Sequence, residues 1–177
     1  IAVTWDGGRF RLVRHRIWKP TPTEPLDLEA TIEAELRELS GRFCVQRILC
    51  DPWQLARSIA TLKAAGLPIE EFPQTQSNTS AMGATLWEVL TSRNITLYGD
   101  DELRTQALNT VAVEGPRGFR IAKEKSSRKI DAIVALAMAC RSAVDEPVAS
   151  VEILSTSLAR GPSNVVHGCQ SRDGVHC

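Results

Sequence analysis

Two aspartates stand at places in the sequence where carboxylates commonly do chemistry. Asp51 follows the apolar run "FCVQRILC" (43–50) and precedes Pro52, so it lies where a buried strand gives way to a helix. Asp131 lies in the first turn of a predicted helix whose other residues from 130 to 139 are Ala, Ile, Val, Leu or Met. If a strand end and a helix start bring them together, their oxygens would form a site of the kind that Mg²⁺ or Mn²⁺ prefers.

Each aspartate also has a simpler explanation that the sequence leaves open. Asp51 could merely cap the helix that follows it, and Asp131 could lie at a helix start because the helix dipole favours an acid there. The dipole explains an exposed acid better than one among Ile130, Ala132 and Ile133. We expect Asp131 to be desolvated there, at an energetic cost that a metal or a hydrogen-bond donor must offset.

The basic residues are concentrated in parts of a chain whose net charge is zero. Residues 117–129 contain six Arg or Lys against Glu124, and residues 1–20 contain five against Asp6. A polyanionic partner needs a basic face rather than a basic total, so these segments could contact nucleic acid. On charge alone, ordinary solvated surface is an equally good explanation.

Length and composition favour one globular domain without a membrane span. The chain has 177 residues, of which 43% are apolar and 24% charged. It contains neither a P-loop nor a GxSxG motif, and its opening residues do not resemble a signal peptide. Three cysteines lie in apolar segments, which predicts reduced core residues and a cytosolic protein; they are Cys44, Cys50 and Cys140.

The order of the predicted elements indicates an α/β domain with a mixed central sheet flanked by helices. Two β-rich runs flank Asp6-Gly7-Gly8 and predict a hairpin. Asp27 is expected to cap a helix that extends to about residue 40. Further predicted elements are a strand at 43–50, a helix at 53–65, a strand at 67–72, a helix at 80–92, a strand at 94–98, a helix at 100–109, a turn and strand within 115–123, and a helix from 131. Residues 149–177 lack apolar periodicity and are expected to be a disordered tail.

Other residues of reactive or aromatic type have less support for a functional role. His15 lies between two arginines and is expected to be a surface residue. The four tryptophans are expected to pack in the core or at its rim; they are Trp5, Trp18, Trp53 and Trp87.

The stretch from residue 43 to residue 143 resembles the C-terminal nuclease domain of phage large terminases, the motor proteins of DNA packaging. Four segments carry the resemblance: "RILCDPWQ", "FPQTQSNTSAMGATLWEVL", "LYGDDELRTQALNTVA" and "IAKEKSSRKIDAIVALAMA". The opening hairpin extends it toward the amino terminus, so the resemblance covers most of the chain.

The resemblance implies a ribonuclease H-like fold, a phage or prophage source and metal-dependent cleavage of concatemeric double-stranded DNA. Family members place the second of three catalytic acids at the end of a central strand and the third at the start of the last helix, here Asp51 and Asp131. The implied reaction uses two Mg²⁺ or Mn²⁺ ions, one activating water and the other stabilising the departing 3′ oxygen. The residues expected to approach DNA phosphates are Lys123, Lys125, Arg128 and Lys129.

The family's first acid lies on the first strand, ahead of the segment that "IAVTWDGGRF" resembles, so we expect it to fall before Ile1. Asp6 is instead expected to be a turn residue. The nuclease domain, residues 1–148, is therefore expected to have a truncated first strand and to be nearly inactive alone. Implied partners are double-stranded DNA, an N-terminal packaging ATPase domain, the small terminase and the portal, at the procapsid in the host cytoplasm and without a membrane.

Two alternatives remain open at this point. The chain could be another ribonuclease H-like nuclease of the resolvase or transposase type, which the sequence upstream of Ile1 would distinguish through the presence or absence of a P-loop ATPase. It could also be an inactive prophage remnant that only binds DNA, which metal titration would distinguish.

Overall fold

The chain begins with the hairpin that the sequence predicted. The structure, a computed structural model, describes residues 1–6, 8–115, 118–125 and 128–145. Strands β1 (Ala2–Trp5) and β2 (Phe10–Arg14) pair in antiparallel fashion. The Asp6 carboxylate accepts hydrogen bonds from the backbone N–H groups of Gly8 (3.1 Å) and Arg9 (2.8 Å), so Asp6 is a turn residue as predicted.

The strands form three small sheets in the described ranges, where a single mixed sheet was expected. β2 also pairs in parallel with β5 (Ile95–Thr96), which makes the first sheet mixed. β3 (Ile48–Cys50) and β4 (Ile69–Glu71) form a parallel pair, while β6 (Thr110–Gly115) and β7 (Gly118–Lys123) form an antiparallel hairpin. Because β3 and β4 have three residues each, they offer few backbone groups for wider pairing. The α/β class is confirmed, and the continuous sheet is not found.

The helices follow the predicted order, but some begin elsewhere. Asp27 caps the first helical segment as expected, since its Oδ1 accepts hydrogen bonds from the N–H groups of Glu29 (3.0 Å) and Ala30 (3.1 Å). The helix predicted from residue 80 begins earlier, because the Thr75 hydroxyl accepts the Asn78 N–H (3.2 Å) and caps a polar first turn. The helical segments are η1 (Glu29–Glu33, a π-helical turn), α1 (Ala34–Arg42), α2 (Ala56–Ala64), α3 (Gln76–Thr91), α4 (Asp101–Leu108) and α5 (Asp131–Asp145).

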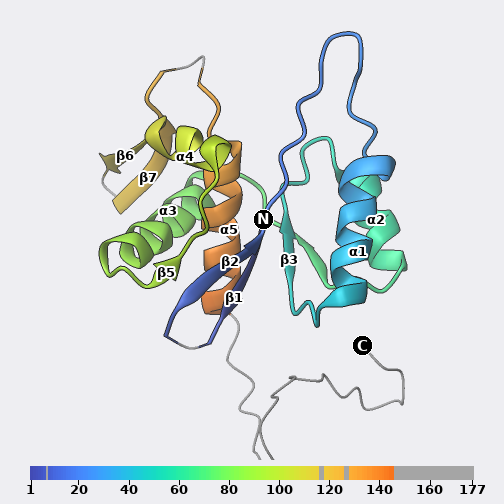
Figure 1. The fold of residues 1–177 in the computed structure, drawn as a ribbon, viewed down its shortest axis with the longest axis horizontal. Helices are drawn as coiled ribbons and strands as arrows, with labels where there is room; N and C mark the ends of the chain where they lie inside the picture. The colour runs from blue at the N-terminus through green and yellow to red at the C-terminus, as the bar shows by residue number, and fades with distance from the viewer. Residues whose placement is uncertain (7, 116–117, 126–127, 146–177) are drawn as a thin grey trace, which may run out of the picture.

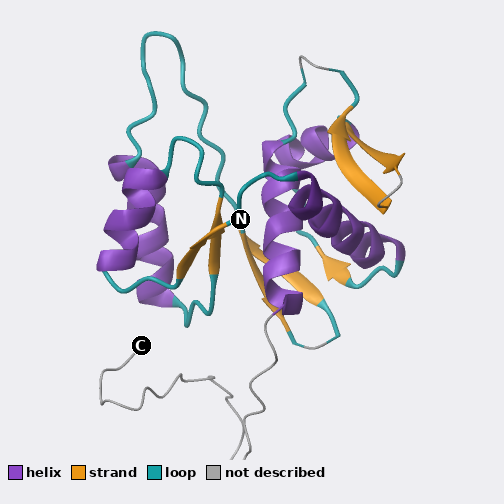
Figure 2. Ribbon diagram, turned by 180° about the vertical axis from the view of Figure 1, so that it is seen from behind, coloured by secondary structure: helices purple, strands orange, loops and turns teal. Residues whose placement is uncertain are grey.

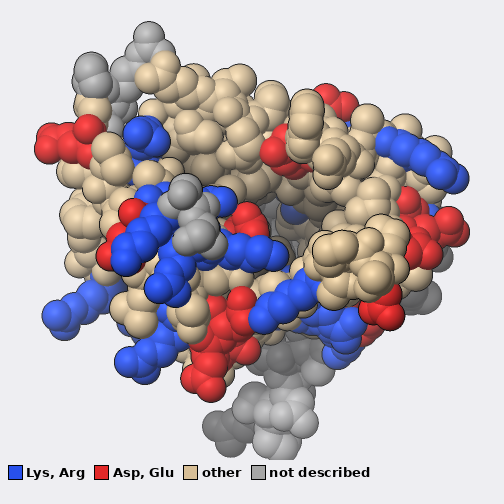
Figure 3. All heavy atoms as spheres, turned by 90° about the horizontal axis from the view of Figure 1, so that it is seen from above, with Lys and Arg blue, Asp and Glu red and all other residues tan. Residues whose placement is uncertain are grey.

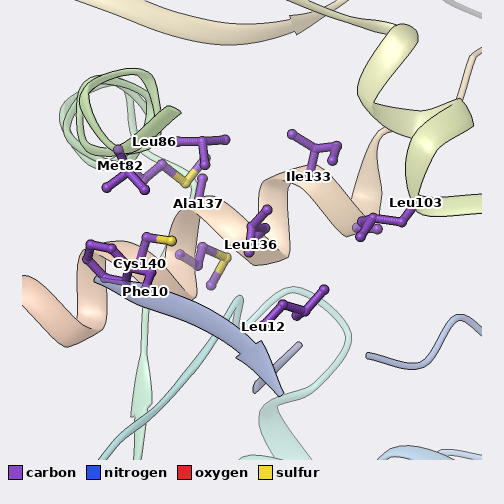
Figure 4. Packing of buried hydrophobic residues seen from close by; sticks show 12 residues of the cluster. Phe10, Leu12, Met82, Leu86, Leu103, Ile133, Leu136, Ala137 and Cys140 are labelled. Atoms are coloured by element: carbon purple, nitrogen blue, oxygen red, sulfur yellow. The ribbon is translucent and has the colours of Figure 1, made fainter. Parts of the chain in front are cut away.

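Helix α5 is the centre of the larger hydrophobic core. Leu136, Ala137 and Cys140 of this helix are at most 2% exposed and pack with residues of α3, α4 and β2 (Figure 4). Burial raises the pKa of the Cys140 thiol to about 12, which makes this cysteine an unreactive core residue. A smaller core between α2 and β4 comprises Ile59, Leu62 and Ile69.

Helix α5 also joins two groups of elements. In Figure 1, α1, α2 and the β3–β4 pair lie on one side of it, and α3, α4 and the β6–β7 hairpin lie on the other. Figure 2 shows the same division from behind. α5 contacts β3 of one group and α3 and α4 of the other, and it also contacts β1. Of the helices in the described ranges, none is long and apolar enough to cross a membrane.

Three side chains lie in surroundings other than those expected. Cys44 is exposed and disulfide-bonded, so it is not a reduced core residue. The His15 side chain is only 8% exposed, whereas Trp53 is 78% exposed. Tertiary neighbours decide such burial, and local sequence does not specify them. The predicted tail, residues 149–177, lies outside the described residues.

Candidate functional site

Asp51 lies in a tight turn at the carboxyl end of β3. Its Oδ1 accepts a hydrogen bond from the backbone N–H of Trp53 at 3.1 Å, and the Leu55 N–H donates to the Pro52 carbonyl at 3.1 Å. Gln54, with φ at 62°, occupies the left-handed region that non-glycine residues rarely adopt. Helix α2 begins after this turn and has no side-chain cap, so Asp51 is not the helix cap that the simpler explanation required. The Asp51 side chain is half-buried.

Asp131 is the first residue of α5, as the sequence predicted, but its environment was predicted wrongly. Asp131 is exposed, while its neighbours Ala132 and Ile133 are 5% and 6% exposed. The Asp131 side chain faces away from the core, whereas the side chains of Ala132 and Ile133 lie in it. The Asp131 carboxylate therefore needs no metal to offset burial, and the helix dipole favours it where it lies.

Gln106 of α4 is a site residue that the sequence analysis missed. It is 2% exposed, and its Oε1 accepts the backbone N–H of Ala132 at 2.8 Å. Its Nε2 donates to Glu102 Oε1 at 3.3 Å. Gln106, Asp131 and Lys129 line the same open pocket. No local sequence signal marks such a contact, because the bonded groups are 26 residues apart.

The carboxyl end of β3 and the amino end of α5 lie on the same, upper side of the molecule in Figure 1, and α5 contacts β3. These are the two chain ends that carry Asp51 and Asp131. The donors are carboxylate oxygens, which suit Mg²⁺ or Mn²⁺ in kind. The site has few such donors. In the described parts of the chain, no group of three or more His, Cys, Asp or Glu could hold a metal ion.

The four predicted DNA-contacting residues are exposed and lie between β7 and α5. Lys123 is the last residue of β7, and the others lie on the segment that leads to Asp131; they are Lys125, Arg128 and Lys129. None of the four forms a salt bridge within the described ranges, whereas Arg14, Arg16 and Lys19 are paired with glutamates. Figure 3 looks onto this side of the molecule and shows Lys and Arg side chains gathered beside a hollow. The charges of the four predicted DNA-contacting residues are therefore available to bind an anion.

A second polar cluster joins β2 to α4 and has a structural explanation. His15 Nε2 lies 3.3 Å from Asp100 Oδ1, and the His15 ring stacks on Tyr98. Asp100 also caps α4 by accepting the Leu103 N–H at 2.7 Å. That hydrogen bond, followed by the nearby His15, holds the pKa of the Asp100 carboxyl below its usual value. The buried His15 is thus part of a helix-cap network.

Comparison with known proteins shows similarity over most of the chain. A family model, the terminase large subunit endonuclease domain, matches residues 12–146. Among solved structures, the crystal structure of the large terminase of bacteriophage HK97 is similar in fold, with a TM-score of 0.58 and 24% sequence identity. That similarity covers 70% of this chain and 26% of the HK97 protein, so the chain spans about a quarter of that terminase. No curated protein sequence matches.

The family match spans both Asp51 and Asp131, the basic segment between β7 and α5, and the whole of α5. It therefore covers both candidate carboxylates and the two elements that carry them. The chain belongs to the family of terminase large subunit endonuclease domains.

Proposed function

We propose that this domain is a metal-dependent endonuclease that cuts concatemeric double-stranded DNA during packaging of a viral genome. Membership of the terminase endonuclease family supports cleavage of DNA in this setting. The proposal includes a ribonuclease H-like architecture. Its support is the mixed α/β character of the structure, whose described strands form three small sheets. For the whole protein we propose an N-terminal packaging ATPase domain, a small terminase and a portal as partners, at the procapsid in the host cytoplasm.

Asp51 and Asp131 are the residues that we propose to hold Mg²⁺ or Mn²⁺. The single observation that carries this assignment is that the two carboxylates follow β3 and begin α5, two elements in contact whose relevant ends face the same side of the molecule. When bound, two such ions would supply positive charge for activating water and for stabilising the departing 3′ oxygen. Asp131 is exposed and can meet the DNA backbone, while the turn around Asp51 restrains the other carboxylate.

The four cations between β7 and α5 are proposed to bind the DNA backbone next to this site. They are exposed, they lack salt-bridge partners within the described ranges, and Lys129 lines the same pocket as Asp131. Contacts from Lys and Arg to phosphates do not distinguish bases, so we expect little sequence preference from this surface. Their role is to hold the duplex against the carboxylates.

A plasmid cleavage assay with Mn²⁺ tests the assignment of the two carboxylates. Asp51→Asn and Asp131→Asn should each abolish nicking and linearisation of supercoiled plasmid, and chelation of the metal should do the same to the unsubstituted chain. Asp145→Asn is a matched control, because Asp145 lies at the other end of the same helix and, among the described residues, forms an ion pair with Arg141 alone. Full cleavage by the Asp131 variant would overturn the assignment, and loss of cleavage in the Asp145 variant would show that the assay responds to damage of the helix.

Cleavage by residues 1–177 is expected to be slow. Two carboxylates bring two negative charges to a site that would accept two divalent cations, so one ion should be weakly held. The family resemblance implies that a complete site holds the two ions with three acids. We therefore expect the cleavage rate to keep rising with Mn²⁺ concentration after the first ion site is filled, and a rate that stops rising at that point would contradict a weakly held second ion.

A further inference from the structure

One backbone N–H group in the first turn of α5 donates its hydrogen bond to a side chain of another helix. The N–H groups in the first turn of a helix have no acceptor within that helix. Here the N–H groups of Ile133 and Val134 reach the carbonyl of Ile130, at 2.9 and 3.0 Å. The Ala132 N–H instead donates to the side-chain oxygen of Gln106 on α4, at 2.8 Å. The peptide unit directly after Asp131 is therefore held from outside α5.

The surroundings of Gln106 allow its amide one orientation. Its Nε2 donates to Glu102 Oε1 at 3.3 Å, and its Oε1 accepts the Ala132 N–H. A flipped amide would place an oxygen against a carboxylate and an N–H₂ group against an N–H, so both contacts would be lost. Glu102 is itself held by Lys19, whose Nζ lies 2.5 Å from Glu102 Oε2. Both polar atoms of the buried Gln106 amide are thus held by hydrogen bonds.

The Asp131 carboxylate makes no hydrogen bond or ion pair with the other residues that the structure describes. Its side chain is exposed, so the direction of its carboxylate depends on the backbone of the first turn. We propose that Gln106 is a positioning residue that fixes the first turn of α5 and thereby the direction in which Asp131 presents its carboxylate. This inference rests on the proposed function, in which Asp131 binds metal.

The variant Gln106→Leu removes the acceptor and keeps a side chain of similar size. The probe is Mn²⁺ alone, titrated into ¹⁵N-labelled protein, because a bound paramagnetic ion broadens the amide signals around it. We expect the amide signal of Ala132 to shift upfield in the metal-free variant as its hydrogen bond is lost. We also expect the Mn²⁺ concentration needed for broadening near Asp131 to rise about tenfold, as is usual when a group supporting a metal ligand is removed.

A matched control separates positioning from general stability. Val89→Ala removes buried volume from α3 but no hydrogen bond from the start of α5. It should lower the melting temperature while leaving the Mn²⁺ midpoint unchanged. If Gln106→Leu behaves like Val89→Ala, Gln106 is only a core residue and the proposal is overturned. Gln106→Met, which keeps an unbranched side chain, replaces the leucine variant if that protein does not fold.

Exchange of the two interacting groups provides a rescue test. In the double variant Gln106→Glu with Glu102→Gln, the carboxylate accepts the Ala132 N–H and the amide donates to the carboxylate. We expect this protein to recover much of the Mn²⁺ affinity, whereas Gln106→Glu alone should not, because two carboxylates then face each other. Equal Mn²⁺ midpoints in the single and double variants would contradict the proposed hydrogen-bond chain.

Asp131→Asn distinguishes failure of this inference from failure of the proposed function. If Asp131→Asn abolishes site-specific broadening and Gln106→Leu leaves it unchanged, only the positioning role is wrong. If Asp131→Asn has no effect on broadening, the metal site itself is wrong, and the role of Gln106 falls with it. Weakened broadening in both variants, with an unchanged midpoint in Val89→Ala, is the result that supports the proposal.

Discussion

Gly83 of α3 lies directly against the backbone of Phe119 in β7. A Cβ atom added to Gly83 would lie 2.9 Å from the Phe119 carbonyl oxygen and 3.2 Å from the Arg120 Cα. Nearby, the Trp87 and Phe119 rings stack with centroids 5.1 Å apart. This close approach ties α3 to the strand that leads into the basic segment before α5.

Gly83→Ala is therefore expected to destabilise the domain by about 1–3 kcal/mol, because backbone atoms cannot move aside as a flexible side chain can. Thermal or urea unfolding followed by circular dichroism would measure the change. Gly41→Ala is the matched control: Gly41 lies in α1, and a Cβ atom added there would have no neighbour within 4 Å, so alanine should stabilise by about 0.5–1 kcal/mol. Equal effects at both glycines would contradict the close-packing explanation.

Local signals predicted much of the fold correctly. The turn at Asp6, the cap at Asp27, the helix that starts near Asp100 and the apolar run of α5 each depend on residues close in sequence, and each is confirmed. The start of α3 was missed because its first turn is polar, and the Thr75 cap was not recognised. In each of these cases the deciding interaction spans only a few residues.

Non-local contacts account for the remaining differences. Whether β3 and β5 join one sheet depends on how strands distant in sequence approach each other, and the described strands form separate sheets. The composition around Asp131 suggested burial, but exposure is decided by which way the first turn of α5 faces. Gln106 could not be identified, because an amide in a polar helix looks like a surface residue until its partner is known.

Cys140 should be unreactive in the native protein. It has no exposed surface, and burial raises the pKa of its thiol to about 12, so the reactive thiolate is scarce at neutral or mildly alkaline pH. Iodoacetamide labelling followed by mass spectrometry should leave the Cys140 peptide unmodified in native protein and modify it fully in denaturing urea. Rapid labelling under native conditions would show that α5 opens locally.

The Asp100 cap should make part of the domain's stability depend on acid pH. Its pKa is lowered in the folded protein, first by the Leu103 N–H and then by His15, so the stabilisation is present above the carboxyl's unfolded pKa. It is lost as the pH falls through the lower, folded pKa. Asn at this position can still cap the helix but carries no charge.

Wild-type protein should therefore be more stable than Asp100→Asn near neutral pH, and the difference should shrink as the pH falls from about 5 to about 3. Urea midpoints measured at several pH values would test this. A difference that stays constant across the range would show that the Asp100 charge contributes nothing to the cap.

Charge reversal in the basic segment tests the proposed DNA path. Lys123→Glu, Lys125→Glu and Lys129→Glu together should weaken binding to duplex DNA, because each lysine is exposed and has no salt-bridge partner within the described ranges. Each phosphate contact that is lost removes about 0.9 from the slope of log K against log salt concentration, so a slope smaller by about 2–3 is expected. Fluorescence anisotropy with two unrelated duplexes should show the same loss for both, since backbone contacts do not distinguish sequences.

A control with the same change in charge decides whether the effect belongs to this surface. Arg57 and Lys63 are exposed on α2, and Arg104 is exposed on α4. Reversing these three should lower affinity only through the long-range field, which salt screens within a Debye length of about 8–10 Å. The salt slope should then stay close to that of the unsubstituted protein, because no phosphate contact is removed. If both triple variants reduce the slope equally, DNA binding follows net charge and the segment before α5 has no special role.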